Sequence, residues 1–199
     1  MFHLILFEPE IPPNTGNIIR LCANAGATLH LVRPLGFSLD DAQLRRAGLD
    51  YHDLARVREH PNLAACLQQL DIARVFPVET QGGTRHTDQR YRAGDAFLFG
   101  RETSGLPADV LSLFSADQVI RLPMIPGNRS LNLSNAAAIV LYEAWRQYDL
   151  SGAGVSESPA ARYQMAADVP VARTVTDSAS SASNAGISSG RASRKPCPS

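Results

Sequence analysis

Apolar residues along this chain form short runs that alternate with amphipathic segments and polar loops. Runs of about five apolar residues, such as Phe2 to Phe7, are typical of strands buried on both faces of a parallel sheet. The expected strands are 2–7, 28–32, 74–78, 96–99 and 119–122, with a short one near 55–57. The expected helices are 14–25, 40–47, 62–70, 107–114 and one from about 133 to 146. The alternation predicts an α/β fold, with a mainly parallel sheet of about five or six strands flanked by helices.

The first expected helix follows a proline-rich break and has recognisable ends. Asn14 or Thr15 is the expected N-cap, because both side chains can accept a hydrogen bond from a free backbone N–H. Gly26 is the expected residue that ends the helix.

The segment 120–146 joins a strand, a polar loop and the last helix. Two adjacent stripes of this helix are apolar, so we expect it to be buried on more than one side. The stripes consist of Leu133, Ala137, Leu141 and Trp145, and of Ala136, Val140 and Ala144. The segment is interpreted either as a core helix with an Asn or Ser cap, or as part of a ligand site at a strand end. The second interpretation uses the polar residues Asn128, Arg129, Ser130 and Asn132.

Composition divides the chain near residue 150. Residues 151–199 contain eleven serines and a single aromatic residue, Tyr163, without sustained periodicity. Such a stretch buries too little apolar surface to offset its ordering entropy. We therefore expect a domain over 1–150 and a disordered Ser/Ala/Gly-rich tail over 151–199, for which contact with nucleic acid is the functional alternative.

Charge and cysteine content narrow the classes of function. Nineteen basic residues balance nineteen acidic ones, so no general positive field for nucleic acid is expected. Arg45 and Arg46, close to Arg56 and Arg58, are interpreted either as a local phosphate-contacting patch or as an ordinary solvated face. Three cysteines without Cys-x-x-Cys spacing disfavour a disulfide framework or zinc site. With no apolar run long enough to span a membrane, the expectation is a soluble, cytoplasmic protein.

Polar clusters follow three of the expected strands, at Asn14–Arg20, Gly100–Gly105 and Asn128–Asn132. In a parallel sheet these clusters lie at the same edge, where open α/β sheets bind ligands. They match neither the dinucleotide Gly-x-Gly-x-x-Gly nor a Walker loop, and the chain has no Gly-x-Ser-x-Gly. Glu102 is either a general base or a cap on the following helix. The histidines lack metal-ligand spacing, and His3 and His30 are expected to be satisfied core or edge residues.

The three clusters together resemble the motifs of the SPOUT methyltransferases. They read NTGNIIR (14–20), FGRETSGLP (99–107) and IRLPM followed by RSLNLSN (120–135). The opening LFEPEIPPNTG and the segment RRAGLDYH (45–52) narrow the resemblance to the TrmL family of tRNA (cytidine/uridine(34)-2′-O)-methyltransferases, over about residues 1 to 148. It implies a C-terminal trefoil knot and a homodimer. It also implies S-adenosylmethionine-dependent 2′-O-methylation of the wobble nucleotide in the tRNA anticodon stem-loop, in leucine isoacceptors.

The resemblance also implies roles for individual residues and no metal. The cofactor-binding positions are Val78, Gly100, Leu122 and Ser130, the catalytic positions are Arg20, Asn14, Glu102 and Asn132, and candidate RNA contacts are Arg45, Arg46 and Tyr142. Because arginine stays protonated, we expect Arg20 to stabilise a developing alkoxide or contact phosphate rather than to abstract a proton.

Three alternatives to this function stay open. A SPOUT ribose methyltransferase could act on another tRNA or rRNA site, or the fold could serve a non-catalytic RNA-binding protein. A generic doubly wound nucleotide-binding protein is disfavoured by the missing phosphate fingerprint.

Overall fold

A computed structural model of the chain describes residues 1–38, 54, 56–69 and 74–154. Contacts between Cα atoms gather residues Met1–Gly154 into one compact unit. The expected helix at 40–47, the Arg45/Arg46 pair and nearly all of the expected tail lie outside the described residues. The division into a domain and a disordered tail therefore stays a prediction.

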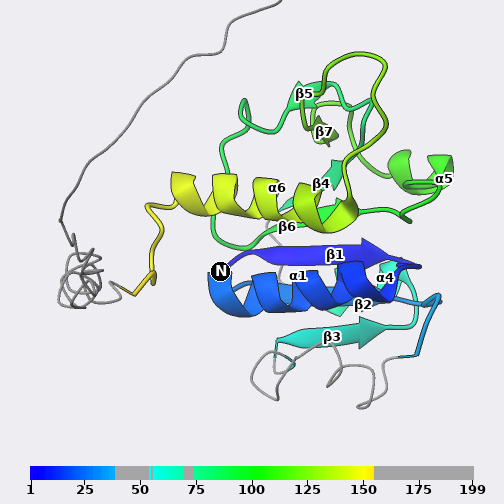
Figure 1. Cartoon of the computed structure of the whole chain (residues 1–199), viewed down its shortest axis with the longest axis horizontal. Coiled ribbons are helices and arrows are strands. Elements are labelled where there is room, and N and C mark those ends of the chain that lie inside the picture. Colours follow the sequence, from blue (N-terminus) through cyan, green and yellow to red (C-terminus); the bar gives the residue numbers. More distant parts are fainter. Residues whose placement is uncertain (39–53, 55, 70–73, 155–199) are drawn as a thin grey trace, which may run out of the picture. The chain divides into compact units, whose positions relative to one another are not determined.

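The unit is built on a seven-stranded sheet in the order β3-β2-β1-β6-β4-β7-β5, and every pairing is parallel (Figure 1). The strands are β1 His3–Phe7, β2 Thr28–Val32, β3 Val57–His60, β4 Arg74–Val78, β5 Thr84–Arg85, β6 Asp95–Phe99 and β7 Ile120–Arg121. The described helices are α1 Pro12–Ala25, α4 Leu63–Gln69, α5 Ala108–Leu111 and α6 Leu133–Gln147. The predicted α/β fold with a parallel sheet is confirmed, with more strands than expected.

Both faces of the sheet are buried, which explains the continuous apolar runs. Leu4 and Leu6 of β1 point into a cluster that includes buried residues of α1 and α6. Ile5 and Phe7 alternate to the other face, where they pack with residues of α4 and α5. The two longest helices, α1 and α6, pack against each other on the first face (Figure 1).

Helix α1 begins differently from the prediction. Its N-cap is Ile11, which makes no side-chain cap, and prolines occupy the first helical positions. Proline is favoured there because the missing N–H would have no intrahelical partner. Asn14 and Thr15 are buried in the first turn, so their prediction as caps is wrong. The predicted end is confirmed, because Gly26 is left-handed, with φ 69°, and its N–H bonds to the Cys22 carbonyl.

Shorter elements account for the other differences. Strand β5 has two residues and was missed because its sequence looks like a loop. Strand β3 lies at Val57–His60 rather than 55–57, and α5 covers only Ala108–Leu111 of the predicted 107–114. Elements this short contain too few residues to show a period.

A row of histidines crosses the first three strands. His3 Nδ1 lies 3.1 Å from His30 Nε2, and His30 Nδ1 lies 3.0 Å from His60 Nε2, so His3 and His30 have partners as predicted. His30, His60 and Cys66 bring potential metal ligands within 4.8 Å of one another, although their sequence spacing gave no such signal. The hydrogen bond between the two rings accounts for their closeness without an ion.

Candidate functional site

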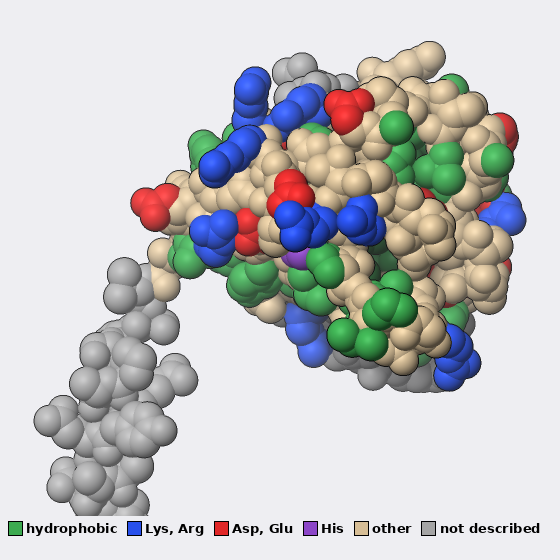
Figure 2. Space-filling model, turned by 90° about the horizontal axis from the view of Figure 1, so that it is seen from above, with side chains coloured by type: hydrophobic (Ala, Val, Ile, Leu, Met, Phe, Trp, Pro, Cys, Tyr) green, Lys and Arg blue, Asp and Glu red, His purple; other side chains and the backbone are tan. Residues whose placement is uncertain are grey.

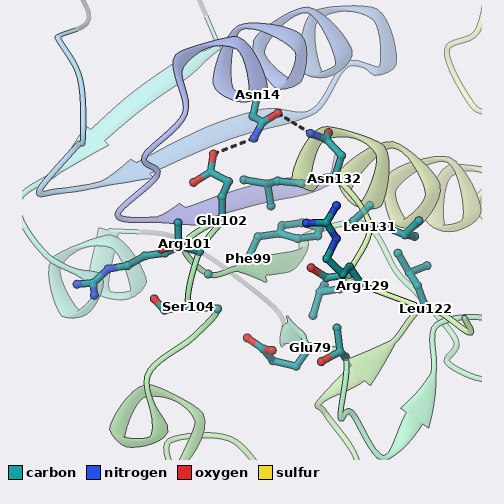
Figure 3. Close-up of a pocket in the computed structure, with 18 of the residues that line it drawn as sticks. Asn14, Glu79, Phe99, Arg101, Glu102, Ser104, Leu122, Arg129, Leu131 and Asn132 are labelled. Carbon is teal, nitrogen blue, oxygen red and sulfur yellow. Dashed lines mark hydrogen bonds between the residues drawn. The ribbon is translucent and has the colours of Figure 1, made fainter. Parts of the chain in front are cut away.

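A cavity of about 740 Å³ opens where β4, β6 and β7 end (Figure 3). These strands are adjacent or nearly so in the sheet, so the loops that follow them meet although they are far apart in sequence. This convergence at the carboxyl edge is the arrangement predicted for the polar clusters.

Most of the residues implied by the resemblance line this cavity. They are Asn14, Val78, Gly100, Glu102, Leu122, Ser130 and Asn132. Arg20 is not among the lining residues and is exposed on α1, and Tyr142 is 47% exposed on α6. Arg45 and Arg46 lie outside the described residues.

A chain of three polar side chains crosses the upper part of the cavity in Figure 3. Asn14 donates from Nδ2 to Glu102 Oε1 at 3.1 Å, and its Oδ1 accepts from Asn132 Nδ2 at 2.9 Å. Asn132 is also the N-cap of α6, since its Oδ1 accepts from the N–H groups of Ser134 and Asn135 at 3.0 and 3.4 Å. The chain therefore fixes the start of α1, the loop after β6 and the start of α6 relative to one another.

Glu102 does not cap the following helix, α5, which was one of its two predicted roles. Its carboxylate accepts from the N–H groups of Glu10 and Ile11 at 2.8 and 3.2 Å, next to the start of α1 rather than α5. With the bond from Asn14 it accepts three hydrogen bonds. A carboxylate engaged in this way is suited to orient Asn14.

The same two loops are joined at two further points. The Arg101 guanidinium forms an ion pair with the Glu8 carboxylate. The hydrogen bond within this ion pair raises the pKa of the guanidinium. Glu10 Oε2 accepts from the Thr103 hydroxyl at 2.7 Å. The loop before α1 is thereby braced against the loop after β6.

Gly100 is required by the folding of its own loop. A Cβ at this position would lie 2.1 Å from the carbonyl carbon of Gly105 and 2.3 Å from the nitrogen of Leu106, both backbone atoms. The approach is closed by Arg101 N–H to Gly105 O at 3.2 Å and Gly105 N–H to Arg101 O at 2.9 Å. The spacing of the two glycines thus reflects contact of the loop with itself as well as access for a ligand.

The lower part of the cavity combines apolar side chains with one carboxylate. Val78, Phe99 and Leu122 provide apolar surface at the three strand ends, which suits a planar base. Glu79 follows Val78 directly and was not singled out from the sequence. Its position just after a buried strand was the signal that could have identified it.

Comparisons with known proteins identify relatives of this chain. Residues 1–142 match the model of the SpoU rRNA Methylase family. A tRNA (cytidine(34)-2′-O)-methyltransferase of Methylovorus glucosotrophus is 58% identical over 153 residues, which covers 77% of this chain and 99% of that protein.

Two solved structures are similar as well. One is a structure described as giving insights into the 2-OH methylation of C/U34 on tRNA. It is 44% identical to this chain with a TM-score of 0.69, and the match covers 75% of this chain and 97% of that one. The other is the SpoU methyltransferase AviRb from Streptomyces viridochromogenes with the cofactor AdoMet, with a TM-score of 0.64 and 25% identity over 74% of this chain and 60% of that one. Within the described residues, no helix has the length and apolar character needed to cross a bilayer.

Proposed function

The chain belongs to the SpoU rRNA methylase family, and on that premise we propose that it methylates the 2′-hydroxyl of cytidine or uridine 34, the wobble nucleotide of tRNA. The methyl donor is S-adenosylmethionine. The observation that carries the proposal is the cavity at the ends of β4, β6 and β7, with an apolar wall on one side and the hydrogen-bonded chain Glu102–Asn14–Asn132 on the other. One side suits the nucleoside of the donor, and the other suits a polar acceptor.

When bound, S-adenosylmethionine would supply an electrophilic methyl group to the ribose 2′-oxygen, and the hydroxyl proton would pass to water. The chain's own residues hold the reacting groups in line, which is a large part of such catalysis. Val78, Gly100, Leu122 and Ser130 hold the donor, since all four line the cavity. We assign to Asn14, Glu102 and Asn132 the positioning of the acceptor side.

Arg20 is assigned to the acceptor oxygen, where a fixed positive charge stabilises the negative charge that develops as the proton leaves. It lies six residues after Asn14, about 9 Å further along the helix and about 240° around it. Arg20 is exposed on the outer side of α1 and does not line the cavity of its own chain. We therefore propose that it acts at the cavity of a second subunit.

A homodimer formed by the outer sides of α1 and α6 would provide this arrangement. Ile139 and Tyr142 of α6 are 42% and 47% exposed, which is unusual for large apolar side chains on a helix that packs with α1. A two-fold axis through this surface would bring each Arg20 toward the other subunit.

We further propose that the segment from β7 to α6 forms the trefoil knot of the SPOUT class. The position of β7 between β4 and β5, followed by a return of the chain to α1, supports this threading. We also propose that the protein acts in the cytoplasm.

Recognition of the anticodon stem-loop is assigned to local contacts. Arginine side chains are grouped on the face shown in Figure 2, with acidic side chains among them, rather than forming one uniform positive surface. Single-stranded loops are bound by phosphate contacts together with stacking of splayed bases. Of the predicted RNA contacts, the Arg45/Arg46 pair is the candidate for the phosphate contacts, whereas Tyr142 belongs to the proposed dimer surface.

The test is methylation of purified tRNA transcripts by the recombinant protein, with the modified nucleotide mapped by mass spectrometry. We expect a 2′-O-methyl group at nucleotide 34. Methylation only at another tRNA or rRNA ribose would instead assign the chain to a different SPOUT substrate. Arg20→Ala should abolish methylation and leave the affinity for S-adenosylmethionine nearly unchanged; loss of both would make Arg20 a fold or cofactor residue.

Mixed dimers test whether Arg20 acts across subunits. Arg20→Ala is combined with a cavity variant that is itself inactive, such as Asn132→Ala. If Arg20 serves the partner's cavity, each mixed dimer has one complete site, and activity returns on mixing. If it serves its own cavity, the mixture stays inactive.

A further inference from the structure

One carboxylate in the cavity has no role in the mechanism above. Glu79 follows the last residue of β4 and is half-buried in the cavity wall. Figure 3 places it on the opposite side of the cavity from Asn14, Glu102 and Asn132. It is therefore remote from the side chains assigned to the acceptor.

The backbone holds Glu79 in place from both sides. Its N–H donates to the Ile120 carbonyl at 2.9 Å, and its side-chain Oε1 accepts from the Leu106 N–H at 2.7 Å. A Cβ at Gly105 would lie 2.9 Å from Oε1 and 3.2 Å from Oε2, and Gly105 has a φ of 69°. The missing side chain at Gly105 leaves the space that the carboxylate occupies.

The second carboxylate oxygen is available to a ligand. Among the described residues, Oε2 has no hydrogen-bond or ion-pair partner, whereas Oε1 is bonded to Leu106. An ionised carboxylate only accepts hydrogen bonds, so its ligand must donate them. A position in the wall of the cavity that is only half-exposed favours a ligand over bulk water as the partner.

The neighbouring side chains indicate which donor groups these are. Glu79 is one residue beyond Val78, and adjacent Cα atoms are about 3.8 Å apart. Val78 belongs to the apolar wall with Leu122, where a nucleoside base would pack, so the group next to the base should face Glu79. In a nucleoside that group is the ribose, and carboxylates commonly accept hydrogen bonds from ribose hydroxyls.

We propose that Glu79 determines specificity for the methyl donor by accepting hydrogen bonds from its ribose hydroxyls. This inference rests on the proposed function, because it assumes that the cavity binds an adenosyl ligand. A hydrogen bond to a charged group contributes about one to two powers of ten in affinity. Loss of the Glu79 charge should therefore weaken donor binding by about tenfold or more.

Calorimetric titration with three ligands tests the assignment. They are S-adenosylmethionine, S-adenosylhomocysteine and the 2′,3′-dideoxy form of S-adenosylhomocysteine. Glu79→Gln keeps an oxygen for the Leu106 N–H and removes the charge, and Asp109→Asn, at an exposed residue outside the cavity, is the matched control. We expect Glu79→Gln to lower the affinity for the first two ligands by similar factors of about ten or more. The affinity for the dideoxy ligand should hardly change.

Other outcomes overturn the assignment in distinct ways. If Glu79→Gln weakens the binding of S-adenosylmethionine alone, Glu79 faces the sulfonium charge rather than the ribose. If the substitution weakens the binding of the dideoxy ligand by the same factor, Glu79 contacts the amino group or the base of the ligand. If Glu79→Gln does not fold, Glu79→Asp takes its place. The ratio of the affinities for S-adenosylhomocysteine and for its dideoxy form should then be larger for the wild type than for this variant. Failure of wild type to bind any of the ligands would refute the proposed function instead.

Discussion

The histidine row makes the stability of the fold dependent on pH in a predictable direction. Burial, then the charges of His3, His60 and Arg58, lowers the pKa of His30 from 6.5 to about 3. Burial also lowers the pKa values of His3 and His60. All three rings are therefore held neutral in the folded chain over a range of pH in which free histidines take up protons.

The sign and size of the effect follow from proton linkage. Above about pH 7.5 both the folded and the unfolded chain hold His30 neutral, and the group contributes no pH dependence. Below 6.5 the unfolded chain binds a proton that the folded chain does not bind until about pH 3. Between pH 7.5 and 5 the free energy of unfolding should fall by about 2 kcal/mol from His30 alone, at 1.36 kcal/mol per pKa unit. His3 and His60 act in the same direction.

The assay compares wild type with His30→Gln in urea unfolding at pH 7.5 and 5. Trp145 is the single tryptophan, and its indole donates to the Ser151 carbonyl at 3.0 Å, so its fluorescence reports unfolding. Protein concentration is held equal because association shifts apparent stability. The difference in unfolding free energy between the two proteins should change by about 2 kcal/mol between the two pH values. Parallel pH dependence of the two proteins would refute the reasoning.

Four further substitutions test the packing and the polar contacts of the fold. Gly100→Ala should lower the free energy of unfolding by about 3 kcal/mol or more and abolish donor binding, because the added Cβ would clash with the backbone. Gly127→Ala is the control, since nothing lies within 4 Å of its added Cβ. It should lower the free energy of unfolding by about 1–2 kcal/mol from the positive φ alone. Asp95→Asn should lower it by about 3 kcal/mol, because the buried carboxylate accepts from Arg74 at 2.7 and 3.1 Å; equal melting temperatures for variant and wild type would contradict this. Asn132→Ala should lower stability by about 1 kcal/mol through loss of the α6 cap and reduce methylation far more, as measured by thermal unfolding and by methyl transfer to tRNA.

The central strands could be predicted from the sequence, and the sheet edges could not. Strands β1, β2 and β6 are apolar throughout because both faces are covered, and that pattern is visible without a structure. Strand β5 has two residues, and β3, at the edge, has two successive exposed residues, Arg58 and Glu59. Their pairing depends on partners distant in sequence, which no local pattern contains.

For the site, the three polar clusters could be located, but not the bonds between them. The resemblance placed Asn14, Glu102 and Asn132 together, and the structure brings all three to one cavity. That Glu102 bonds to the backbone just before α1 depends on a contact across 91 residues of sequence. Arg20 shows the opposite limit, because its motif assigns it to the site, whereas the structure does not place it among the residues that line the cavity of its own chain.

The polar chain also explains how the two halves of the proposed reaction are kept in register. Glu102 belongs to the loop whose Gly100 shapes the donor side, and it bonds to the backbone that begins α1. Asn132 caps α6, the helix that packs against α1. A displacement of the loop after β6 would therefore move α1, and with it the Arg20 that we propose to act at the cavity of a second subunit. Since an in-line transfer loses rate steeply with a misplacement of about 1 Å, this bracing provides a physical reason for a carboxylate rather than a neutral residue at position 102.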